Sequence, residues 1–171
     1  TPSLKGERAF DTSTGGATHT RRRPVGVVAG ICPVNVPAMG PMGMHPIAIA
    51  TGNAVILKPA SATPSAALLT AELYKEAGLP DGVFNVVSGN RPMVPKVLEH
   101  PRIDAISFVG PTPVAHIAQT TGTTHRKRVQ ALGGATNHAI VMHDSDPDFA
   151  AQPTSAPTPA PDRPRAMAPP A

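Results

Sequence analysis

The feature that most constrains the fold of this chain is a regular alternation of short β-branched runs with helix-forming segments. The strand-like runs are VGVVAGI (25–31), AVILK (54–58), GVFNVV (82–87), DAISFVG (104–110), KRVQAL (127–132) and HAIVM (138–142). Helices are expected between them, over 38–50, 64–78, 91–99 and 113–121. Strands that alternate with helices at this interval predict a parallel sheet with crossover helices. We therefore expect an α/β fold of the three-layer, nucleotide-binding (Rossmann-like) type.

The clearest helix signal is the segment PSAALLTAELYKEAG, which starts at Pro64. Proline suits the first turn of a helix, because its missing N–H would be unpaired there in any case. Ala66, Leu69 and Leu73 recur at helical spacing, and Gly78 follows as a natural residue to end the helix. The sequence therefore predicts a helix over this segment.

Composition changes at both ends of the predicted domain. Residues 1–23 are polar and are expected to form an extended leader, and the partial nucleotide-binding domain is predicted over 24–149. Residues 150–171 contain seven prolines and no hydrophobic period, so they are predicted to be disordered. A Pro-rich ligand for an SH3-type partner and a non-functional tail are both open interpretations, and a frameshifted or truncated gene product would also give this composition.

Charge and composition limit the partners of the chain. The net charge of +4 and pI near 9.7 come largely from basic clusters at 21–23 and 125–128. Such clusters permit anionic ligands, but aromatics make up only 3% of the chain, which leaves little for stacking nucleic-acid bases. No apolar run is long enough to span a bilayer. A single cysteine excludes an intrachain disulfide and is typical of a reducing, cytoplasmic compartment.

No G-x-G-x-x-G fingerprint is present, so a binding site has to be sought at individual strand ends. Gly89 and Gly110 each follow a predicted strand, at the type of junction where phosphates bind in such folds. Lys58 ends a predicted buried strand and precedes Pro59, which places it at the carboxyl edge of the sheet. A ligand contact and a lysine that merely extends to solvent from a strand end are both consistent with that position.

Five segments together resemble the cofactor-binding half of the aldehyde dehydrogenase family. They are RRPVGVVAGICPVNVPAM, GNAVILKPASATPSAALLTAEL, EAGLPDGVFNVVSG, LEHPRIDAISFVGPTPVA and KRVQALGGATNH, and the resemblance spans roughly residues 4–149. Within the family, the ALGGA-x-NH variant and MGPMGMHPIAIATGN look most like the acylating branch, methylmalonate-semialdehyde dehydrogenase. The resemblance implies NAD as cofactor, an aldehyde as substrate and a homo-oligomer for a full-length member.

The resemblance also implies roles for residues after the first strand. Asn35 stands where the family places an asparagine whose amide donates to the oxyanion of the thiohemiacetal, as a preorganised donor should. Cys32 stands before that asparagine and would line the nicotinamide end of the cofactor cleft, beside Val34. The nucleophilic cysteine of the family lies in a later segment, so Cys32 is expected to be a small buried residue and this chain to lack a catalytic thiol.

Further cofactor contacts are implied at the other strand ends. Lys58 matches the lysine that binds the adenosine ribose, and Ser61 replaces the carboxylate commonly found three residues later, which implies either weaker ribose contacts or a preference shifted toward a phosphorylated ribose. Gly110 matches the glycine that approaches the pyrophosphate, and Pro111 replaces a serine, with the loss of an N–H and a hydroxyl. Gly133 belongs to the LGG motif. No metal is implied.

The resemblance finally bears on the reaction. Ala131 stands where most members carry the glutamate that activates water, so transfer of the acyl group to coenzyme A is the expected fate of the thioester. The usual aromatic pair of the family is replaced by Gly43 and His45. We expect a fragment of an NAD-dependent, acylating semialdehyde dehydrogenase that is inactive alone. A non-catalytic nucleotide- or partner-binding protein is the alternative.

Overall fold

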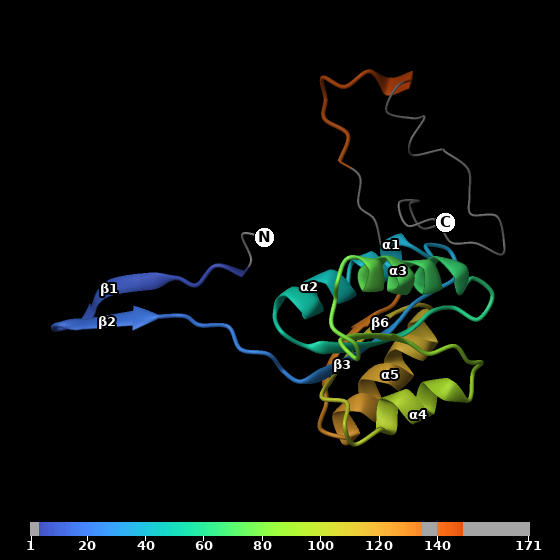
Figure 1. The fold of residues 1–171 in the computed structure, drawn as a ribbon. Helices are drawn as coiled ribbons and strands as arrows, with labels where there is room; N and C mark the ends of the chain where they lie inside the picture. Colours follow the sequence, from blue (N-terminus) through green and yellow to red (C-terminus); the bar gives the residue numbers. More distant parts are fainter. Residues whose placement is uncertain (1–3, 135–139, 149–171) are drawn as a thin grey trace.

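The computed structural model describes residues 4–134 and 140–148 (Figure 1). Seven strands and five helices are assigned within these ranges. The strands are β1 (Arg8–Ser13), β2 (Gly16–His19), β3 (Val27–Ile31), β4 (Ala54–Lys58), β5 (Phe84–Val86), β6 (Ala105–Val109) and β7 (Arg128–Leu132). The helices are α1 (Met39–Met42), α2 (His45–Ala50), α3 (Ser65–Glu76), α4 (Met93–Glu99) and α5 (Thr112–Thr124).

Five strands form one sheet in the order β5-β4-β3-β6-β7, and all of its neighbours run parallel. Helices α1, α2 and α3 lie on one face of this sheet and α4 and α5 on the other (Figure 1). The predicted three-layer α/β fold is therefore confirmed. The chain winds outward from β3 to β5, then returns to place β6 on the opposite side of β3. The order of the strands thus reverses between β3 and β6.

The core follows from the β-branched and aromatic residues that the strand runs supply. Ile106 and Phe108 of β6 pack with Val97 and Leu98 of α4 and with two alanines of α5, Ala115 and Ala118. A smaller cluster on the other face joins Leu57 of β4 to Ala67 of α3 and to Cys32. Burial of these apolar side chains is the main stabilising term of the fold, at about 25 cal/mol per Å² of apolar surface.

The predicted helix over 38–50 is wrong as a single element, because the structure divides it into α1 and α2. Gly43 ends α1, and Pro46 occupies the first turn of α2. Proline lacks the N–H that a continuous helix would need at this point, so the backbone restarts there. The break turns His45 inward, where its side chain is fully buried.

The predicted helix at 64–78 is confirmed as α3, and Gly78 follows it with a positive φ of 85°. Two of the apolar residues that mark its helical spacing face solvent, since Leu69 and Leu73 are 55% and 54% exposed. The helix instead contacts the sheet through Ala67, which is 1% exposed. A small side chain at the contact allows the helix axis to lie close to the strands, which periodicity alone does not reveal.

Two further segments flank the five-stranded sheet. The leader contains an antiparallel hairpin of β1 and β2, which extends away from the parallel sheet (Figure 1). The sixth strand expected over 138–142 is wrong for residues 140–142, which lie outside any strand; Ile140 is 86% exposed. A strand needs a neighbour for its backbone hydrogen bonds, and no described strand pairs with this segment. Residues 138–139 and the predicted disordered tail, 150–171, lie outside the described residues.

No helix among the described residues is long and apolar enough to cross a membrane.

Candidate functional site

The predicted site residues all lie at or shortly after the carboxyl ends of strands in the parallel sheet. Cys32, Val34 and Asn35 follow β3, Lys58 is the last residue of β4, and Ser61 comes shortly after it. Gly110 and Pro111 follow β6, and Gly133 follows β7. Because parallel strands have their carboxyl ends at one edge, these residues share that edge. The reversal between β3 and β6 makes it the position where open α/β sheets bind ligands.

Cys32 and Lys58 lie together at the ends of neighbouring strands. The N–H of Cys32 donates to the carbonyl oxygen of Lys58 over 3.2 Å, and both side chains are buried. Burial raises the pKa of the Cys32 thiol to about 11, and the positive charge of Lys58 lowers it only in part. The thiol is therefore protonated at neutral pH, and a protonated thiol is a poor nucleophile.

The Lys58 ammonium is held by its own loop. Its Nζ donates to the carbonyl oxygen of Pro59 over 2.8 Å, and burial lowers the pKa of this lysine. Only one of its three N–H groups has a protein acceptor among the described residues. A ligand hydroxyl or carbonyl that reached this end of β4 could therefore accept from the remaining donors.

Asn35 and Val34 lie in the loop between β3 and α1, and both side chains are exposed. Pro33 and Pro37 restrict φ on either side of them. The loop also closes on itself, since the N–H of Gly40 donates to the carbonyl oxygen of Val36 over 2.9 Å. Asn35 thus lies in a restrained loop that follows the carboxyl end of β3.

Ser61 connects the loop after β4 to the loop after β5. Its hydroxyl donates to the carbonyl oxygen of Gly89 over 2.8 Å. This contact joins Ser61 to Gly89, two positions that the sequence analysis singled out. The serine oxygen keeps acceptor capacity, and the side chain is exposed.

The ends of β6 and β7 meet in a second glycine-rich junction. The N–H of Gly110 donates to the carbonyl oxygen of Leu132 over 3.1 Å. A Cβ at Gly110 would lie 2.7 Å from the Phe108 ring, so only glycine fits there without a shift of that ring. Thr112, which the sequence analysis did not single out, accepts a hydrogen bond from the N–H of Gly134 over 2.8 Å. In the sequence, this contact is indicated by the hydroxyl residue that directly follows Pro111.

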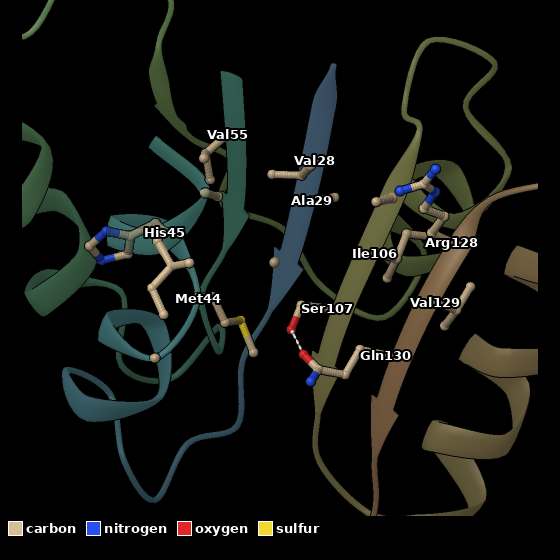
Figure 2. Close-up of a pocket in the computed structure, with 15 residues that line it drawn as sticks. Val28, Ala29, Met44, His45, Val55, Ile106, Ser107, Arg128, Val129 and Gln130 are labelled. Carbon is tan, nitrogen blue, oxygen red and sulfur yellow. Dashed lines mark hydrogen bonds between the residues drawn. The ribbon is translucent and has the colours of Figure 1, made fainter. Parts of the chain in front are cut away.

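A separate groove of about 490 Å³ lies on the sheet face between α2 and β6–β7 (Figure 2). Its lining is mostly apolar and includes Val28, Met44 and Ile106, with a hydrogen bond between Ser107 and Gln130 over 3.1 Å. None of the predicted site residues lines it. The residues that line the groove are not those at the carboxyl edge of the sheet. The groove is therefore not the predicted cofactor site.

His45 was also missed as a buried polar residue. Its Nδ1 lies 3.0 Å from the Tyr74 hydroxyl, and its ring contacts those of Tyr74 and Phe84. Its Nε2 is buried without a hydrogen-bond partner in the described part of the chain. Burial lowers the pKa of this imidazole to about 4. The group is therefore a neutral member of an aromatic cluster at pH 7.

Comparisons with known proteins identify the family of the chain. The model of the aldehyde dehydrogenase family matches residues 2–157. The chain belongs to the aldehyde dehydrogenase family. Among curated members, malonate-semialdehyde dehydrogenase of Pseudomonas aeruginosa is 52% identical over 147 residues, which are 86% of this chain and 30% of that protein. The resemblance seen in the sequence is thus confirmed.

Solved structures of aldehyde dehydrogenases share the fold. The methylmalonate-semialdehyde dehydrogenase of Oceanimonas doudoroffii has a TM-score of 0.79 at 48% identity, over 90% of this chain and 32% of that one. A Sinorhizobium meliloti 1021 structure, named for the same activity and complexed with NAD, has a TM-score of 0.79 at 47% identity, over 90% of this chain and 31% of that one. The chain therefore spans less than a third of the length of these relatives, as expected of a partial family chain.

Proposed function

We propose that this chain supplies the NAD-binding part of an acylating semialdehyde dehydrogenase. The observation that carries the proposal is the β3–β6 strand reversal, with the predicted cofactor residues at the carboxyl edge beside it. The similarity to a relative solved with NAD supports it. The nucleotide-binding unit is proposed to extend over 24–149, with the hairpin outside it.

The residues present at the edge are suited to a dinucleotide. Gly110 and Gly133 permit the backbone to approach a phosphate closely, since neither carries a side chain there. Lys58 and Ser61 would hold the ribose near the ends of β4 and β5. Cys32 and Val34 would line the nicotinamide end, with Pro111 beside the pyrophosphate. When bound, NAD accepts the hydride that the aldehyde loses.

Asn35 is the residue of this chain proposed to take part in the chemistry. Its amide N–H would donate to the oxygen of the aldehyde as negative charge develops there. The restrained loop around it supports this role, because a donor held in place costs little reorganisation. The thiol that attacks the aldehyde would come from a part of the family chain beyond the region matched here.

The acyl acceptor is proposed to be coenzyme A. Ala131, in β7, offers no carboxylate to activate water. A thiol acceptor needs no such base, provided that it arrives as a thiolate. Malonate or methylmalonate semialdehyde is the proposed substrate class for a full-length member, by analogy with the named relatives.

Calorimetric titration of the purified chain with NAD tests the proposal directly. We expect saturable binding with one site per chain, and competition by ADP-ribose, which shares the groups that would contact Lys58 and Gly110. Absence of heat at millimolar NAD, from a chain whose circular dichroism shows folded α/β structure, would overturn it.

A further inference from the structure

The groove between α2 and β6–β7 has no part in the proposed function. Helix α5 packs on one face of β6 and β7, and the other face of these strands forms part of the groove floor. Side chains alternate between the two faces of a strand, so Arg128 and Gln130 of β7 lie on the groove side, where both are exposed. The groove volume of about 490 Å³ is within the range of small-molecule sites, about 300–1,000 Å³.

The strand register aligns one row of groove residues across four strands. Val28 of β3 is paired with Val55 of β4 and with Ala105 of β6, and Ala105 is paired with Arg128 of β7. All four residues line the groove. Neighbouring strands are about 4.8 Å apart, so the row extends over about 14 Å. It is apolar on its first three strands and cationic on the fourth.

The apolar part of the groove is deepened by a glycine and bounded by α2. A Cβ at Gly30 would lie 3.1 Å from the Met44 Sδ and 3.2 Å from the Leu57 Cδ1, so a side chain there would displace one of them. Ile47 of α2 lines the same part and is 51% exposed. A hydrocarbon chain laid in this part would remove the exposed apolar surface from water, which favours binding.

The other end of the groove offers hydrogen-bond donors and a positive charge (Figure 2). The Arg128 guanidinium has no hydrogen bond or ion pair to a described residue. The Gln130 Oε1 accepts from the Ser107 hydroxyl over 3.1 Å, which leaves the two N–H groups of the Gln130 amide to donate elsewhere. No Asp or Glu lines the groove. This end is therefore suited to a carboxylate, which only accepts.

We propose that the groove binds a medium-chain fatty carboxylate, with its tail over Val28 and Met44 and its carboxylate at Arg128 and Gln130. A peptide is a poorer occupant, because its backbone N–H groups would meet few acceptors along this lining. The groove shares no residue with the carboxyl edge of the sheet, so the inference is independent of NAD binding.

Calorimetric titration of the full chain with octanoate and with 1-octanol tests the proposal. Octanoate should bind saturably, with one site per chain. Arg128→Met keeps most of the apolar stem and removes the guanidinium. It should weaken octanoate about 10-fold or more, as for other hydrogen bonds to charged groups, and leave 1-octanol unchanged. Arg91→Met, at an exposed position outside the groove, is the matched control and should stay within about twofold of the parent.

NMR of the methionine methyl groups locates the ligand in the parent chain. Octanoate should shift the signal of Met44, which lines the groove, and leave that of Met93, which packs on the core cluster under α4. Ala105→Leu fills the floor and should weaken octanoate and 1-octanol alike, by about 10-fold or more.

The outcomes that overturn the proposal are distinct. No saturable binding of octanoate at millimolar concentration, or equal octanoate affinity in Arg128→Met and the parent, would overturn the carboxylate site. A shift of Met93 in place of Met44, or parent-like affinity in a folded Ala105→Leu, would overturn its location. The methionine signals decide the location even if Ala105→Leu does not fold.

Discussion

Cys32 and Lys58 are joined by a 3.2 Å hydrogen bond from the N–H of one to the carbonyl oxygen of the other, at the carboxyl ends of β3 and β4. The lysine charge nearby favours a thiolate, but burial opposes it more strongly, so the pKa of the thiol rises to about 11. Burial therefore decides the chemistry of the only cysteine in the chain.

The first prediction concerns the reactivity of this thiol. At pH 8 a thiol with a pKa near 11 is ionised to about one part in a thousand, against roughly a tenth for an ordinary cysteine. Alkylation by iodoacetamide should therefore be about 100-fold slower in the folded chain than in urea. Mass spectrometry of timed samples measures both rates, and equal rates would show that Cys32 is accessible and ionised.

The second prediction concerns turnover. The chain with NAD, coenzyme A and methylmalonate semialdehyde or propanal should form no NADH, because a neutral buried thiol cannot attack the aldehyde. Cys32→Ala should leave the absorbance at 340 nm unchanged. Steady NADH formation that disappears in Cys32→Ala would show that this thiol is the nucleophile after all.

The third prediction concerns Lys58. Lys58→Met keeps most of the buried volume and removes the ammonium, so NAD affinity should fall about 10-fold or more, as for other hydrogen bonds to charged groups. Lys75→Met, in the exposed last turn of α3, is the control and should bind as the parent does. Unchanged affinity in Lys58→Met, measured by the same titration, would leave Lys58 with no part in cofactor binding.

Sequence reasoning predicted what depends on local pattern. The five strands of the parallel sheet follow β-branched runs, and the site positions follow from the ends of those strands. It failed where a distant contact decides. Ala67 rather than Leu69 meets the sheet, which no spacing rule distinguishes within one apolar helix.

The same reason explains the residues that were missed. Thr112 matters because a glycine 22 positions later donates to it, and His45 because Tyr74 and Phe84 close over it. Asn53 is a third case, since its Oδ1 accepts from the N–H groups of Val25 and Gly26 over 2.6 and 3.1 Å. These partners become neighbours only when the sheet has formed.

The fourth prediction concerns the choice between NAD and NADP. Ser61 carries no charge that would repel a phosphate on the ribose, so the parent should bind NADP within about 10-fold of NAD. Ser61→Glu should weaken NADP selectively, and Ser61→Ala, the control, should change both affinities equally. Competition titrations with the two cofactors measure the ratio. An unchanged ratio in Ser61→Glu would place this residue away from the ribose.

The last prediction concerns the stability of the fold against acid. The pKa of His45 is about 4 in the folded chain and near 6.5 when unfolded, because burial beside Tyr74 and Phe84 disfavours the imidazolium. Between these values the unfolded chain binds more protons than the folded one, so the free energy of unfolding falls as the pH falls. The contribution of neutral His45 to the free energy of unfolding is complete above pH 6.5 and is lost by about pH 4, with a limit of roughly 3 kcal/mol.

Urea unfolding of the parent and of His45→Phe at pH 7.5 and 5.0 measures this contribution. His45→Phe keeps a ring in the cluster and removes the titrating group, so its stability should change less between the two pH values. His125→Phe, at an exposed position, is the control and should follow the parent. Equal pH dependence in His45→Phe and the parent would mean that His45 is solvated or finds an acceptor on protonation.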